Sequence, residues 1–172
     1  MAPAHLPPRD HHHHGHHQHG TPSLNRTAFM ATLHCLSGCA VGEVLGMVIG
    51  TALGLGTIAT IALAVTLAFL FGYAFTMWPL LRAGIAPKRA AALAFASDTA
   101  SIALMETIDN AIMAVWPGAM DAGLGSPVFW IALATSLVLA GLAAYPLNRA
   151  LIARGKGHAV VHAHHGGHGH QL

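Results

Sequence analysis

Residues 32–50 read T-L-H-C-L-S-G-C-A-V-G-E-V-L-G-M-V-I-G, and this stretch decides the fold. Side chains that can bind metals recur in it at every fourth position, and so do glycines. Residues four apart lie above one another on one face of an α-helix. Glycine at that spacing leaves a groove that lets a second helix come close, as in membrane helix pairs. The stretch therefore predicts a closely packed helix with two stripes, which are Cys35, Cys39, Glu43 and Met47, and Gly38, Gly42, Gly46 and Gly50.

The composition argues against an ordinary soluble domain. Of the 172 residues, 54% are hydrophobic and only 8% are charged. A soluble domain carries about 25% charged residues, so this chain has too few charges for a water-exposed surface. The net charge is +2, and no basic patch with interleaved aromatic residues occurs. We therefore expect the lipid bilayer, and no nucleic acid, as a partner.

Four apolar runs fill the middle of the chain, at about residues 27–53, 57–81, 90–116 and 128–152. Each exceeds the roughly 20 residues that a helix needs to cross a hydrocarbon core of about 30 Å. The connections between them are short, which favours an up-and-down arrangement. The sequence predicts an all-α integral membrane bundle of four transmembrane helices over residues 25–153. Histidine-rich tails, expected to be disordered, flank it at residues 1–24 and 154–172.

The basic residues orient this bundle in the membrane. All eight of them precede the first helix, lie in the loop between the second and third, or lie at and after the end of the fourth: Arg9, Arg26, Arg82, Lys88, Arg89, Arg149, Arg154 and Lys156. In an up-and-down bundle these positions share one side, which the positive-inside rule makes cytoplasmic. The leader lacks the apolar core and cleavage site of a secretory signal. We expect a multi-pass protein of the inner (plasma) membrane with both termini in the cytoplasm.

The third apolar run carries three acidic residues, Asp98, Glu106 and Asp109. The first and third helices start on the same side, so depths counted from Thr27 and Ala90 can be compared. Cys35 is then level with Asp98, and Glu43 with Glu106. A charge at the bilayer centre costs at least about 2.5–3.5 kcal/mol on insertion scales. The only lysine or arginine within the runs is Arg149, near the end of the fourth, so none is available inside the membrane and protons or metal cations are the expected counter-charges.

This intramembrane set mixes soft and hard metal ligands. Thiolate and thioether groups favour Cu(I), whereas carboxylate and imidazole suit zinc, nickel or cobalt. The mixture predicts a copper, zinc, nickel or cobalt ion without an organic cofactor, and a purely structural hydrogen-bond network is the alternative. The candidate metal ligands are His34, Cys35, Cys39, Glu43, Met47, Asp98, Met105, Glu106 and Asp109.

The tails hold fourteen of the fifteen histidines. Neutral imidazole is a general ligand for Ni²⁺, Zn²⁺ and Cu²⁺, so both tails are expected to collect metal ions at the cytoplasmic face. The candidate tail ligands are His11, His12, His13, His14, His16, His17, His19, His158, His162, His164, His165, His168 and His170.

Two motifs give the chain a family resemblance. The first helix carries H-C-x3-C-x3-E from His34 to Glu43, and the third carries D-T-x-S-I-x3-E-x2-D-N from Asp98 to Asn110. With these motifs the chain resembles, over about residues 24–165, a bacterial membrane family catalogued as domain of unknown function 4396. The resemblance implies a four-helix integral membrane protein, often with histidine-rich ends, and implies no particular activity.

The leading functional hypothesis is transport, export or membrane buffering of a transition-metal ion. A metal-binding or scaffold subunit without transport activity is the alternative. An enzyme is not expected, because C-x3-C differs from the C-x-x-C of redox motifs and neither H-E-x-x-H nor G-x-S-x-G occurs. Four helices leave little room for a path, so we expect a homodimer packed along the glycine stripe or a complex with another membrane protein.

Overall fold

The computed structural model describes residues 23–154, so the predictions for the two histidine-rich tails lie outside the described residues. This part of the chain is all-helical and contains no strands. Each of the four helices is long and apolar enough to cross a membrane, which confirms the predicted fold class. The helices are α1 (Leu24–Ala52), α2 (Thr57–Arg82), α3 (Pro87–Val115) and α4 (Pro127–Ala153).

Local chemistry explains where the helices begin and end. α1 starts three residues before the predicted run because the Ser23 side chain accepts a hydrogen bond from the backbone N–H of Arg26 at 3.4 Å. α3 starts at Pro87 rather than at residue 90, since proline lacks only an N–H that the first turn leaves unbonded anyway. Gly54 and Gly84 follow α1 and α2 with φ angles of +63° and +80°, a conformation that favours glycine and ends the helix.

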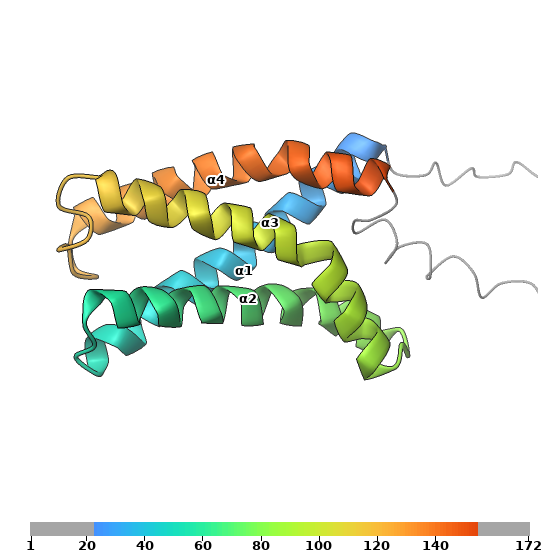
Figure 1. Ribbon diagram of the computed structural model, residues 1–172, viewed down its shortest axis with the longest axis horizontal. Helices are drawn as coiled ribbons and strands as arrows, with labels where there is room; N and C mark the ends of the chain where they lie inside the picture. Colours follow the sequence, from blue (N-terminus) through green and yellow to red (C-terminus); the bar gives the residue numbers. More distant parts are fainter. Residues whose placement is uncertain (1–22, 155–172) are drawn as a thin grey trace, which may run out of the picture.

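The helices form an up-and-down bundle in which α1 crosses behind α3 at an angle (Figure 1). At its first turns α1 packs on the end of α4, where Ala28 and Ala31 meet Ile152. Further along, α1 lies against α2. This crossing places α1 in contact with all three other helices, so its side chains define the interior.

The glycine stripe of α1 lies directly against α2. A Cβ atom built on Gly38 would stand 2.6 Å from the Cα of Gly72, and one on Gly42 would stand 2.2 Å from the backbone nitrogen of Ala68. Such distances allow no side chain without moving the α2 backbone. In this chain α2 occupies the glycine stripe, and the homodimer stays a prediction.

α3 bends after its first turns (Figure 1). Two hydroxyls bond back to the helix at this point, from Ser97 to the carbonyl of Ala94 at 3.2 Å and from Thr99 to that of Phe95. Hydroxyl groups that bond back in this way commonly bend helices. The bend turns the start of α3 away from α4 and leaves Asp98, between the two hydroxyls, in the interior.

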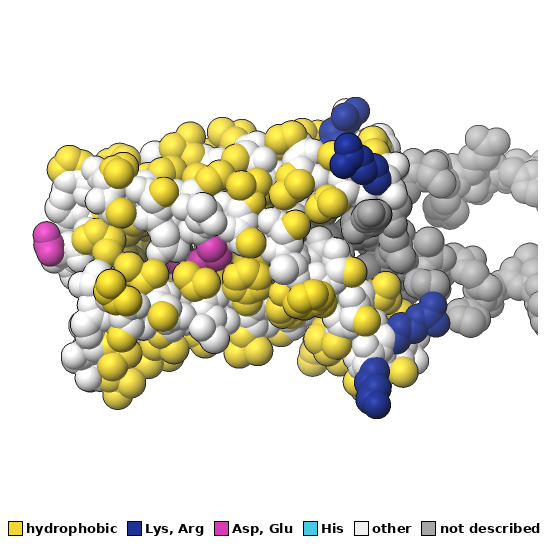
Figure 2. Space-filling view, viewed as in Figure 1, with side chains coloured by type: hydrophobic (Ala, Val, Ile, Leu, Met, Phe, Trp, Pro, Cys, Tyr) yellow, Lys and Arg dark blue, Asp and Glu magenta, His cyan; other side chains and the backbone are white. Residues whose placement is uncertain are grey.

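Basic side chains gather at one end of the bundle, the end at which the described part of the chain begins and finishes (Figure 2). The guanidinium carbon of Arg82 lies 4.7 Å above the ring of Trp78, which is 61% exposed. At the other end, Trp130 donates from Nε1 to the carbonyl of Leu124 at 2.8 Å. Exposed tryptophans near helix ends are typical of membrane–water interfaces.

Candidate functional site

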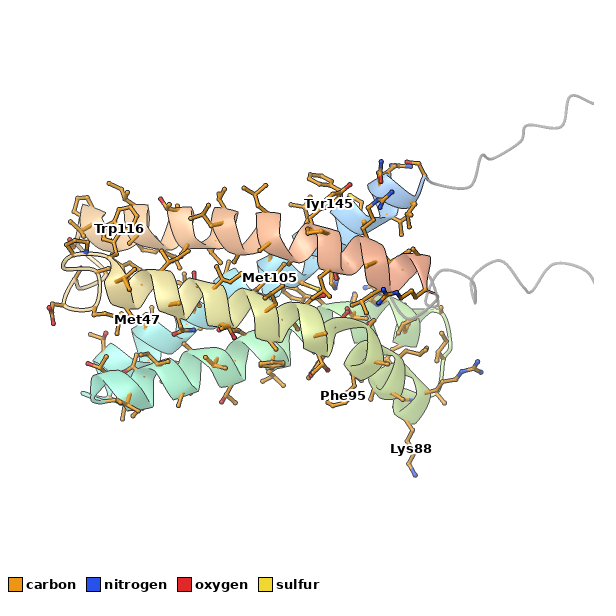
Figure 3. All side chains as sticks on the ribbon, turned by 45° about the horizontal axis from the view of Figure 1, so that its top comes forward. Met47, Lys88, Phe95, Met105, Trp116 and Tyr145 are labelled. Carbon is orange, nitrogen blue, oxygen red and sulfur yellow. The ribbon has the colours of Figure 1, made fainter. Side chains whose placement is uncertain are left out.

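Four acidic side chains lie in the interior of the bundle. Asp98 is 0% exposed, Asp109 2%, Glu106 4% and Glu43 7%. Cys35 and Cys39 are buried beside them as free thiols and pack against the fully buried Met105. Figure 3 shows Met105 in the middle of the bundle. The structure thus brings six of the predicted ligands, and Met105, into one core.

The six groups pair across α1 and α3 and form what we call the acid–thiol ladder. Its first pair is Cys35 with Asp98, its second is Cys39 with Glu106, and its third is Glu43 with Asp109. The two helices run in the same direction, so successive pairs lie at increasing depth. The ladder extends along the bundle from the basic end toward the opposite end.

The predicted depth matching is right for one pair and displaced for the other. Cys35 and Asp98 are neighbours as the counting indicated. Glu106, however, lies beside Cys39, and Glu43 therefore meets Asp109, which lies one helical turn further along α3. Glu106 remains a second neighbour of Glu43. Because α1 and α3 cross at an angle, equal counts from the helix starts do not give equal positions at the contact.

At the basic end, Asp98 has partners from two other helices. Ser97 donates to Asp98 Oδ1 at 2.7 Å, and Thr76 of α2 and His34 of α1 lie near the same carboxylate. The ring of His34 packs edge-on against Phe75, with 5.9 Å between centroids. Thr76, which is 2% exposed, was missed by the sequence reasoning, because a threonine in an uncharged run carries no signal of its own.

At the third pair, Ser136 of α4 donates a hydrogen bond to Asp109 Oδ1. Ser136 is fully buried. It too was missed, because a single serine in an apolar run is more often a helix-packing residue. The hydrogen bond connects α4 to the ladder, so all four helices contribute a polar group to it.

Several carboxylate oxygens of the ladder have no hydrogen-bond partner within residues 23–154: Glu43 Oε2, both oxygens of Glu106, and Asp109 Oδ2. Leaving a buried polar group unsatisfied costs about 1–3 kcal/mol, and more for a charged one. These oxygens therefore offer binding positions for a cation or a proton. In the same residues, however, no three His, Cys, Asp or Glu side chains are grouped closely enough to hold a metal ion together.

The three pairs are therefore separate positions along the bundle and do not form one closed metal site. Four residues rise about 6 Å along a helix, so the pairs on Cys35, Cys39 and Glu43 follow one another at about this interval. A structural zinc site instead closes four ligands around one ion. An ion moving along the ladder would meet one pair after another.

A second polar cluster stands apart from the ladder. Asn148 of α4 donates from Nδ2 to Thr32 Oγ1 of α1 at 3.0 Å and accepts a hydrogen bond from Ser101 of α3. All three residues are buried. The cluster connects three helices near the basic end, and its side chains satisfy one another.

A cavity of about 240 Å³ adjoins the third pair at the end of the bundle opposite the basic residues. Glu43 and Asp109 line it together with Met47, the remaining predicted ligand. Acidic atoms are visible between apolar side chains in the middle of the molecule (Figure 2). The cavity connects the ladder to the loops at that end.

The chain matches none of the curated proteins and none of the solved structures with which it was compared. A family model does match it, over residues 24–157, and this range includes all four helices. The match confirms the resemblance that the two motif helices carry. Since the matched range is most of the chain, the protein belongs to the family described as Domain of unknown function (DUF4396).

Proposed function

We propose that the protein handles a transition-metal ion within the membrane, by transport, export or buffering, and that the acid–thiol ladder is its path. One observation carries the proposal: the ladder holds four buried acids, and no lysine or arginine occurs between Arg26 and Arg82 or between Arg89 and Arg149. Each buried charge costs at least about 2.5–3.5 kcal/mol at the bilayer centre, so the acids need a cationic partner.

A comparison within the bundle favours a cation over a purely structural network. The Asn148 cluster is also buried and polar, and its donors and acceptors satisfy one another. Glu106, by contrast, has only the thiol of Cys39 as a hydrogen-bonding neighbour for its two carboxylate oxygens in the described residues. The neighbouring thiol of Cys39 is a soft metal ligand beside a hard one. A hydrogen-bond network that served only stability would resemble the Asn148 cluster rather than the pair of Glu106 and Cys39.

The charge distribution supports an orientation for this function. The described basic residues lie at one end, so the positive-inside rule places that end, and with it both histidine-rich tails, in the cytoplasm. The membrane is then the inner (plasma) membrane. Imidazoles of the tails would collect the ion near the first pair of the ladder, where His34 lies close to Asp98. This arrangement suits export or buffering better than uptake.

The metal content of purified protein tests the proposal. The full-length chain, with the tail histidines replaced by glutamine, is purified in detergent, and its metals are measured by mass spectrometry. A stoichiometric ion should be present, and it should be lost in Cys35→Ser/Cys39→Ser and in Glu106→Gln. Ser37→Ala is the matched control, since Ser37 lies between the cysteines but is exposed. Full metal retention in the cysteine and Glu106 variants would refute the ladder as the site.

The alternative is a metal-binding or scaffold subunit that holds an ion without moving it. Within residues 23–154 no three His, Cys, Asp or Glu side chains are grouped around one point, which disfavours tight, static binding in the ladder. Ion flux into proteoliposomes separates the two functions. Flux that the Glu43→Gln variant abolishes supports transport, whereas a bound ion that never exchanges supports the scaffold.

A further inference from the structure

The cavity beside the third pair of the ladder is built by parts of the chain that are distant in sequence. Its lining comes from the second half of α1, the start of α2, the end of α3, the α3–α4 loop and the start of α4. The described lysines and arginines lie at the other end of the bundle (Figure 2). Asp121, in the loop, is exposed and lines the cavity. A cation approaching this end therefore meets a carboxylate and no basic side chain of the described residues.

Three methionines line this one cavity: Met47 from α1, Met113 from α3 and Met120 from the α3–α4 loop. Figure 3 shows Met47 at the end of the bundle away from Lys88. The whole chain has only seven methionines. Thioether sulfur is a soft, uncharged ligand that favours Cu(I) over harder divalent ions. Methionine also fills irregular gaps in apolar cores, so the sulfurs alone do not define a site.

The two carboxyl groups in the lining make packing an insufficient explanation. Glu43 and Asp109 are 7% and 2% exposed, and each has an oxygen without a hydrogen-bond partner in the described residues. Both line the same cavity as the thioethers. A hollow that served only to be filled by apolar atoms would not have buried, unsatisfied carboxylate oxygens in its wall. The combination of neutral soft ligands with anionic oxygens suits a soft cation.

We propose that this cavity binds a soft monovalent cation of the Cu(I) type, held by the thioethers of Met47, Met113 and Met120 and balanced in charge by Glu43 and Asp109. The binding site stands on its own observations. It rests on the proposed function only for the passage of the ion between the cavity and the ladder. If the function is export, the cavity is the last site before release. The site also narrows the cargo, because zinc, nickel and cobalt gain little from thioether ligands.

Methionine methyl NMR on the full-length protein in detergent micelles tests the site directly. The protein is labelled with ¹³C at the methionine methyl groups and titrated with Ag⁺, which matches the charge and softness of Cu(I) without its redox chemistry. Single Met→Leu variants assign the signals, since this swap nearly conserves volume and usually costs less than about 1.5 kcal/mol. The methyl signals of Met47, Met113 and Met120 should shift and saturate together. Zn²⁺ at the same concentration should leave them in place.

Methionines elsewhere in the chain are the internal controls. Met30 is 57% exposed on α1, and Met77 packs at the opposite end of the bundle, so neither signal should move. Met105 packs against Cys35 and Cys39 and reports on silver in the core of the ladder. A shift of Met105 with silent cavity methionines would overturn the cavity site and leave the proposed function standing. The cavity site would also be overturned if silver bound only to the tails and the methyl signals of Met47, Met113 and Met120 did not shift.

A charge variant provides the second test. Glu43→Gln/Asp109→Asn removes both anionic partners and keeps the side-chain shapes and the thioethers. The saturating shifts of Met47 and Met113 should then require about tenfold more Ag⁺ or more, which corresponds to about 1.4 kcal/mol. Thr107→Val, an exposed position on α3 outside the cavity lining, is the control and should leave the midpoint unchanged. Equal midpoints for the double variant and the unmodified protein would show that the two carboxylates do not contribute to binding the cation.

Discussion

The carboxyl groups of Glu43 on α1 and Asp109 on α3 lie next to each other inside the bundle. Two like charges in a medium of low dielectric repel strongly, so both cannot stay ionised without a proton or a cation between them. Ser136 satisfies only one oxygen of Asp109. This pair connects the cavity to the rest of the ladder. Its charge state therefore governs whether a proton or a metal cation can bind in the cavity or in the ladder.

Glu43→Gln should raise the stability of the metal-free protein while lowering its metal retention. The amide keeps the shape of the side chain, removes the need to hold a proton between two repelling carboxyl groups and can donate a hydrogen bond to Asp109. We expect a gain of about 1–3 kcal/mol in the free energy of unfolding, measured by thermal melting in detergent. Thr107→Val, at an exposed position on α3 outside the cavity lining, should change neither quantity. A destabilised Glu43→Gln protein would contradict the repulsion between the pair.

Ser136→Ala should destabilise the protein by about 1–3 kcal/mol, because it leaves Asp109 Oδ1 without its donor in the interior. Thr135→Ala is the matched control. Thr135 is the adjacent residue on α4, is only partly buried, and bonds back to the carbonyl of Ile131 at 2.8 Å. Chemical unfolding of both variants in the same detergent checks the difference. Equal stabilities would show that α4 does not support the ladder through this hydroxyl.

Gly42→Ala should weaken the α1–α2 contact. A Cβ atom on Gly42 would stand 2.2 Å from the nitrogen of Ala68, so the helices must separate. Overpacking of this kind typically costs about 1–3 kcal/mol. Gly125→Ala, where a Cβ atom meets nothing within 4 Å, is the control. Melting temperatures that fall only for Gly42→Ala would support the pairing, and an unchanged melting temperature would contradict it.

Asn148 and Ser101 should be energetically coupled. Asn148 connects Ser101 of α3 to Thr32 of α1. Once Ser101 is replaced, replacing Asn148 should therefore cost less free energy of unfolding than it does in the unmodified protein. Double-mutant cycles between membrane helices average about 0.6 kcal/mol and reach about 1.7. The Asn148→Ala/Ser101→Ala cycle, followed by thermal unfolding, should give a value in this range. Asn148→Ala combined with Thr107→Ala, which is exposed on α3, should be additive.

The orientation can be measured by labelling with a membrane-impermeant thiol reagent. Asp121→Cys should react in intact cells, because the α3–α4 loop is expected outside the cytoplasm. Lys88→Cys, at the basic end, should react only after the cells are opened. Cys35 and Cys39 are both 1% exposed and should remain unlabelled in the folded protein. Labelling of Lys88→Cys in intact cells would reverse the assigned orientation.

Much of the architecture follows from the sequence alone. Hydrophobic length determined that four helices form, because a run of apolar residues can satisfy its backbone in a membrane only as a helix. The four-residue spacing of Cys35, Cys39 and Glu43 determined that these side chains share one face of α1. The matching starts of α1 and α3 were enough to place Cys35 beside Asp98. These inferences use local geometry, which repeats regularly along a helix.

The partner of each face was decided by the tertiary structure. The glycine stripe packs against α2, Glu43 meets Asp109 in addition to Glu106, and Ser136 joins the ladder from α4. The crossing angle of the helices also gathered Met47, Met113 and Met120 around one cavity. Periodicity shows which residues share a face but not what that face touches. The contacts depend on how side chains from distant segments fit together, and this fit arises only when the bundle packs.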